Sequence, residues 1–182
     1  KVLHSWEVDT DALFADLKLT TRLESGSIAD GLLSAGMRYY HPTGARGVFF
    51  AGVSAAAGHA LDADHELAIG GDTGLRGYPL RFQSGSGTAL MTLEQRYFTK
   101  YSLWQLASVG AAVFFDMGRA WGETPLGPSE NYGLLKDVGF GLRLGSTSSA
   151  LGNVLHIDVA FPLDGPRNLD QVQFLVKTKR SF

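Results

Sequence analysis

The sequence predicts an all-β protein, an antiparallel transmembrane β-barrel with about eight strands in this chain. Three observations predict this fold. Hydrophobic residues recur with a period of two, the connections between the alternating segments are short at one end and long at the other, and aromatic residues fall near segment ends. Strands with one apolar and one polar face, joined in this way, are typical of a sheet that crosses a bilayer.

Composition is compatible with a single barrel domain over residues 1–182. The chain has a formal net charge of -2, so it lacks the basic field that a nucleic-acid partner requires. It contains no Cys, which excludes a disulfide framework and a thiolate metal site. No run of about 18 apolar residues is present, so we expect no transmembrane helix.

The period-two pattern marks the expected strands. In one segment Val109 and Val113 alternate with Gly110 and Ala112, and in another Ile157 and its neighbours alternate with polar residues. Several segments are about ten residues long, the length that a tilted strand needs to cross a bilayer. We expect strands near residues 2–8, 13–24, 31–41, 46–58, 87–98, 106–116, 136–146, 153–162 and 172–182.

A soluble β-sandwich or lipocalin-like barrel would alternate in the same way, so the connections carry the argument. Those at 42–45 and 147–152 are short, whereas those at 59–86 and 117–135 are long. Membrane barrels have short periplasmic turns and longer external loops. The expected lipid-facing residues are Leu17, Leu19, Val109, Val113, Phe140, Leu142, Ile157, Val159, Phe174 and Val176. The expected interfacial aromatics are Tyr39, Tyr40, Tyr97, Phe98, Tyr101, Trp104 and Trp121.

One loop and two carboxylates form a candidate site. Residues 69–79 read IGGDTGLRGYP, with Arg76 as the only cation. Glu94 and Asp116 lie on expected strands opposite apolar residues, so both point away from the lipid, where a charge would cost several kcal/mol. A guanidinium can bind such carboxylates through two hydrogen bonds. The alternative is a flexible surface loop with ordinary solvated charges nearby.

Five motifs occur in order along the second half of the chain. They are LRGY at 75–78, LMTLEQRYF at 90–98, FFDMGRAW at 114–121, GFGLR at 139–143 and LHIDVAFPL at 155–163, followed by a terminal Phe182. This set resembles the outer-membrane insertase and translocase superfamily, also called the bacterial surface antigen family, which includes BamA, TamA and the two-partner-secretion transporters. The resemblance covers roughly Gly70 to Phe182.

The resemblance implies that this chain is the C-terminal half of a larger barrel in a bacterial outer membrane. Residues 59–86 would be an extracellular loop that folds into the lumen, with the Arg of its motif (Leu75, Arg76, Gly77 and Tyr78) received by Glu94 and Asp116. Gly77 is expected to permit a tight turn, and Tyr78 to pack on the inner wall. Phe182, with Phe174 and Val176, would form an assembly signal.

The implied function is insertion of outer-membrane proteins or translocation of polypeptides, with lipid and a client chain as partners. The alternative is a membrane anchor or pore module that displays or exports an upstream domain, such as a patatin-like lipase. Upstream strands or a second copy of the chain would complete the barrel. We find no catalytic motif and therefore expect no enzyme activity and no cofactor. The group His59, Asp62, Asp64, His65 and Glu66 could bind a divalent cation, but a solvated external loop explains it, and we expect no metal site.

Overall fold

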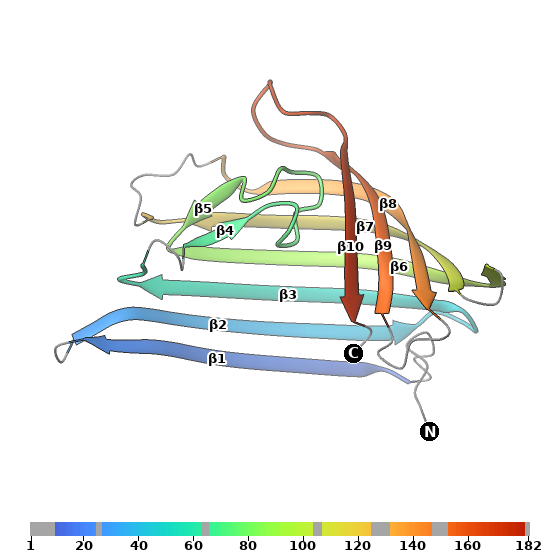
Figure 1. The fold of residues 1–182 in the computed structure, drawn as a ribbon, viewed down its shortest axis with the longest axis horizontal. Helices are drawn as coiled ribbons and strands as arrows, with labels where there is room; N and C mark the ends of the chain where they lie inside the picture. The colour runs from blue at the N-terminus through green and yellow to red at the C-terminus, as the bar shows by residue number, and fades with distance from the viewer. Residues whose placement is uncertain are drawn as a thin grey trace.

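A single antiparallel sheet of eight strands dominates the computed structural model (Figure 1). The structure describes residues 10–24, 27–62, 66–103, 107–124, 132–146 and 153–180. The strands of the sheet, in spatial order, are β1 (Ala12–Glu24), β2 (Ser27–Pro42), β3 (Gly47–His59), β6 (Gly87–Leu103), β7 (Ala107–Trp121), β8 (Leu135–Ser146), β9 (Asn153–Pro162) and β10 (Gln173–Arg180). Each strand pairs with its neighbour in chain order, apart from the hairpin inserted between β3 and β6.

The expected strands are present wherever the structure describes the chain. The segment near residues 2–8 lies outside the described residues. Three strands are longer than expected, since β2 begins at Ser27, β6 continues to Leu103 beyond an irregularity in register, and β7 continues to Trp121. The long connection also contains two strands that the sequence did not indicate, β4 (Leu67–Ile69) and β5 (Gln83–Gly85), which pair with each other. Three residues are too few to display a period-two pattern.

The strand registers divide the side chains into two sets. Residues directly opposite each other in an antiparallel pair point to the same face, so Phe50, Glu94, Phe114 and Gly139 form one row across four strands. The ten expected lipid-facing residues all lie on the other face. Exposed fractions between 48% and 78% are found for Leu17, Leu19, Val113, Phe140, Leu142, Phe174 and Val176.

The sheet curls around its polar face, which we call the concave face. Asp16 on β1 and Lys177 on β10, near opposite edges of the sheet, line the same cavity. The β4–β5 hairpin and the turn that joins its strands lie over this face (Figure 1). The opposite, apolar face is the convex face.

The buried hydrophobic cluster lies between the loop and the sheet rather than within a closed interior. Ile69, Leu75 and Tyr78 come from the loop, while Ala120 and Leu135 come from β7 and β8. The core therefore fixes the loop against the concave face, and this arrangement positions the site described below.

Within the described residues the sheet has two open edges, because β1 pairs only with β2 and β10 only with β9. None of the described segments is a helix long and apolar enough to cross a membrane.

The expected aromatic band is only partly correct. Tyr39, Tyr97 and Trp121 lie on the convex face near strand ends, but Tyr40 and Phe98 point to the concave face. Tyr40 is buried and packs against neighbouring rings. Successive residues of a strand point to opposite faces, so two adjacent aromatics cannot both belong to one band. The side chain of Tyr101 and the whole of Trp104 lie outside the described part of the chain.

Candidate functional site

The turn between β4 and β5 is held by its own backbone. The carbonyl oxygen of Gly70 accepts hydrogen bonds from the amides of Thr73, Gly74 and Leu75. Gly74 has a φ of 127°, a conformation that side-chain-bearing residues rarely adopt. This compact turn presents the next residue, Arg76, to the sheet in a defined orientation.

Leu75 and Tyr78 anchor the turn on either side of Arg76. Leu75 is completely buried in the hydrophobic cluster. The Tyr78 hydroxyl lies 2.8 Å from the carbonyl oxygen of Lys136 and 3.0 Å from that of Asp164, and it accepts a hydrogen bond from the Lys136 amide. Its ring packs against Phe82 at a centroid distance of 5.2 Å. Tyr78 therefore packs between the loop and the sheet, with polar contacts that the sequence did not indicate.

Arg76 meets both carboxylates that the sequence proposed for it. Its Nε and Nη2 donate to the two oxygens of Asp116 at 2.7 and 2.9 Å, and its Nη1 donates to Glu94 at 2.7 Å. The guanidinium carbon also lies 3.3 Å from the ring centroid of Phe114. The side chains of Arg76, Glu94 and Asp116 are each at most 7% exposed. A planar, permanently charged fork is suited to this set of acceptors, which come from two neighbouring strands.

Gly77 has a different role from the expected one. It is not among the glycines with positive φ, so its backbone does not need the freedom of a glycine. A Cβ at this position would instead lie 2.5 Å from the Cβ of Asp137 on β8. Gly77 therefore permits close approach of the loop to the sheet.

Glu94 is the centre of a larger ionic network that the sequence analysis missed. It accepts hydrogen bonds from Arg76, from Arg96 at 2.8 Å and from Arg143 at 3.1 Å. Arg143 also pairs with Asp158, whose other oxygen lies 3.5 Å from Arg76. With Asp116, three carboxylates face three guanidinium groups, so the formal charges of this group balance.

The period-two pattern contained the signal for these extra residues. Arg143 and Asp158 alternate with apolar neighbours on β8 and β9, which predicts that both face inward. Two glycines of β8 leave room for neighbouring side chains. A Cβ at Gly139 would collide with the ring of Phe114, and one at Gly141 with the Arg143–Asp158 pair.

Burial and pairing act on the loop residues in opposite directions. Burial alone lowers the pKa of Arg76, but the hydrogen bonds and charges of Asp116 and Glu94 outweigh it and raise the pKa above its ordinary value. Burial raises the pKa of Tyr78 to about 12, against the opposing effect of its backbone hydrogen bonds. At neutral pH Arg76 is therefore a cation and Tyr78 a neutral phenol.

Asp137 is a buried acid beside this network. It is completely buried and lies directly opposite Asp116 in the β7–β8 register. Its two oxygens lack a hydrogen-bond partner of ordinary geometry among the described residues. Asp116 is paired with Arg76, whereas Asp137 has no ion pair among the described residues. A negative charge on Asp137 would therefore be unfavourable under the loop.

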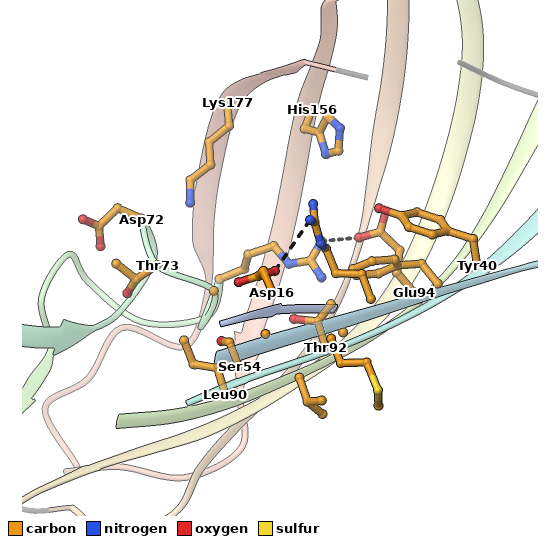
Figure 2. A pocket seen from close by; sticks show the side chains of 18 of the residues that line it. Asp16, Tyr40, Ser54, Asp72, Thr73, Leu90, Thr92, Glu94, His156 and Lys177 are labelled. Carbon is orange, nitrogen blue, oxygen red and sulfur yellow. Dashed lines mark hydrogen bonds and ion pairs between the residues drawn. The ribbon is translucent and has the colours of Figure 1, made fainter. Parts of the chain in front are cut away.

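A cavity of about 830 Å³ remains on the concave face, lined by the loop, by β1, β2, β3 and β6, and by residues of β8, β9 and β10. Figure 2 shows Asp16, Glu94, His156 and Lys177 reaching into it from different elements. Lys177 also donates to the carbonyl oxygen of Gly71, so β10 contacts the loop directly. The concave face thus combines an occupied part, under the Arg76 turn, with an open polar part.

Other proposed residues lie outside this cluster. Phe174 and Val176 are exposed on the convex face of β10, and Phe182 lies outside the described residues. In the acidic loop group, Asp62 pairs with Arg22 and Glu66 with Arg81, whereas Asp64 and His65 are not described. Within the described part of the chain no three His, Asp or Glu side chains come together as metal ligands.

Comparisons with known proteins found no matching family model, curated protein or solved structure.

Proposed function

We propose that this chain forms part of a bacterial outer-membrane β-barrel of the insertase and translocase superfamily. In this proposal the convex face contacts lipid and the concave face lines a lumen that contains the Arg76 loop. The barrel assists the insertion of outer-membrane proteins or the translocation of polypeptides.

The observation that carries the proposal is the contact of Arg76 with Asp116 and Glu94. It fixes a long loop inside the curve of the sheet by charge pairing at 2.7 to 2.9 Å. A barrel that admits a polypeptide needs an occupant that seals the lumen and can be displaced. Polar contacts suit that task because water or a client chain can replace them.

The distribution of apolar residues supports the membrane location. Exposed hydrophobic side chains continue across the convex face from Leu17 on β1 to Phe174 and Val176 on β10. A soluble protein rarely exposes so extensive an apolar surface. Charged side chains gather on the concave face instead, as expected for a lumen.

Folding in detergent tests the barrel. The chain should show strand-type circular dichroism only with detergent or lipid, and an unheated sample should migrate differently from a boiled one. A folded, monodisperse protein in detergent-free buffer would exclude the membrane proposal.

Client folding tests the activity. Vesicles containing the protein and vesicles containing an unrelated barrel of similar size would each receive a urea-unfolded outer-membrane protein. Heat-modifiable migration then measures the folded fraction over time. The proposal expects faster client folding with this protein, by several-fold. Equal rates would contradict an insertase activity and favour the alternative, a membrane anchor for another domain.

A further inference from the structure

The three methionines of the chain line one groove on the convex face. The sequence contains only Met37, Met91 and Met117, and all three border an apolar groove of about 490 Å³ across β2, β3, β6 and β7. Methionine is flexible and polarizable, so it adapts its shape to an apolar ligand. All three methionines of the chain line this groove, and this feature distinguishes it from the rest of the convex face.

The registers show how the groove is built. Ala35, Ala55 and Ala89 lie directly opposite one another on β2, β3 and β6, and the next residue of this row is Arg119 on β7. The neighbouring row on the same face lies two residues away along each strand and consists of Met37, Val53, Met91 and Met117. Alanine side chains therefore form the floor, and three methionines with Val53 form one wall.

Arg119 lies at one end of the alanine row. It is exposed, and within the described part of the chain it makes no hydrogen bond or ion pair. The other convex-face cation nearby, Lys136, is paired with Asp164 at 3.3 Å. A free guanidinium at the end of an apolar groove provides a binding position for an anionic group, and phosphate suits its hydrogen-bonding geometry.

The row of Arg119, Ala89, Ala55 and Ala35 runs from the strand ends, at Arg119, toward the strand centres, at Ala35. Arg119 lies two residues before the end of β7, and Ala89 two residues after the start of β6. Ala55 lies four residues before the end of β3, and Ala35 eight residues after the start of β2. In a membrane this places Arg119 near the interface and the far end of the groove within the hydrocarbon region.

We propose that the alanine groove binds one acyl chain of a lipid whose negatively charged phosphate headgroup is held by Arg119. The inference rests on the membrane location proposed above and adds a lipid site to it. The headgroup lies at the end of the sheet that carries the long connections, and the acyl chain runs across β6 and β3 toward β2.

The methionines provide the test. Protein labelled with ¹³C at the methionine methyl groups is folded in a zwitterionic detergent, and folding is verified by heat-modifiable migration. Dimyristoyl phosphatidic acid is titrated in, with dimyristoyl phosphatidylcholine as the control lipid. The methyl signals should shift with saturation for the anionic lipid, and at much higher concentration or not at all for the zwitterionic one.

Two variants with matched controls separate headgroup from chain. Arg119→Gln should weaken phosphatidic acid binding about tenfold, whereas Lys136→Gln should change it less than twofold. Ala55→Phe should fill the groove and abolish saturable binding. Ala111→Phe places the same ring on the convex face outside the groove and should leave binding intact.

Saturable binding that is weakened about tenfold in Arg119→Gln and lost in Ala55→Phe, but kept in the two control variants, would support the lipid site. Equal shifts with both lipids, or full binding in Arg119→Gln, would overturn it while leaving the barrel proposal in place. A protein that folds without detergent would overturn the membrane location itself, and the lipid site with it.

Discussion

Arg76 and Asp116 are joined by two parallel hydrogen bonds, Nε to Oδ2 at 2.7 Å and Nη2 to Oδ1 at 2.9 Å. This pair connects the tip of a loop to the middle of the sheet. Because both side chains are nearly inaccessible to water, removing one partner leaves the other as an uncompensated buried charge.

We therefore expect Arg76→Ala to loosen the loop strongly, at a cost of about 3–5 kcal/mol if water does not enter and less if it does. Arg76→Lys should restore only part of the effect, since an ammonium cannot replace the planar fork. Hydrogen exchange of residues 70–82 and protease sensitivity measure the change. Arg81→Ala is the control, because Arg81 belongs to the same loop but is half exposed. If Arg76→Ala and the double variant Glu94→Gln with Asp116→Asn are both silent, the pairing does not hold the loop.

Tyr78 provides a second, independent anchor. Its pKa of about 12 lies above the ordinary value of about 10, so folding favours the neutral phenol. Its contribution to loop docking is fully present below about pH 10 and is lost as the pH rises through about 12. Tyrosinate absorbance should show that Tyr78 ionises at a higher pH than ordinary tyrosines. The protease sensitivity of the loop should rise over the same pH range.

Tyr78→Phe tests the same anchor at neutral pH. The substitution removes the acceptor of the Lys136 amide and should cost about 1–2 kcal/mol of loop stability. Tyr97→Phe, at an exposed position on the convex face, should have little effect. Unchanged alkaline behaviour in Tyr78→Phe would mean that another group controls the release.

Asp137 is expected to destabilise the docked loop. Asp137→Asn keeps the volume but removes a buried acid opposite Asp116, and should stabilise the fold by about 1 kcal/mol. Urea unfolding in detergent, followed by heat-modifiable migration, measures the difference. Asp164→Asn, at a partly exposed carboxylate, is the control. A clear loss of stability in Asp137→Asn would show that this carboxylate has a stabilising partner.

The contact of Arg76 with Glu94 and Asp116 was implied by the family resemblance, and the local pattern supports it only in part. Alternation in each strand places Glu94 and Asp116 on the polar face, and Arg76 is the only cation of its glycine-rich segment. Arg143 and Asp158 were visible on the same face for the same reason. Their link to Glu94 was not visible, because it depends on how far the sheet curls between β6 and β9.

Two further features could not be derived from pattern. The role of Gly77 depends on the distance between the loop and Asp137, which no local signal encodes. The β4–β5 hairpin has strands of three residues, and its position depends on burial of Ile69 against β7 and β8. Both features result from tertiary packing, whereas the eight long strands result from a repeated local pattern.

Phe182 remains a prediction from resemblance. Deleting it should impair assembly in cells more than refolding in detergent, because an assembly signal is read by cellular machinery, whereas refolding depends on the chain alone. Phe174→Ala and Val176→Ala test the outward row of the same strand, which is exposed at 78% and 65%. Equal loss in cells and in detergent would instead indicate that Phe182 is an interfacial anchor.

The last prediction is that this chain does not close alone into its working barrel. β1 and β10 each have one strand partner within the described residues, and open strand edges are not viable in lipid. An eight-stranded barrel has an interior just wide enough for its own side chains. Here the concave face already holds the Arg76 turn, its hydrophobic cluster and a cavity of about 830 Å³. If the chain forms the proposed barrel, we therefore expect more strands, from an upstream segment of a longer chain or from a second copy.

Particle mass in detergent, corrected for bound detergent, decides between these arrangements and a small closed barrel. The chain has a mass of 19.6 kDa, so a pair of copies joined edge to edge would have about twice that protein mass. Cysteines introduced at Leu17 on β1 and Val176 on β10 extend the test, because they form an intermolecular disulfide only if these edges meet between copies. A strictly monomeric particle whose β1 and β10 pair with each other would contradict the prediction. Such a small closed barrel has no room for the loop, so the loop would lie outside it and Arg76 would be separated from Glu94 and Asp116.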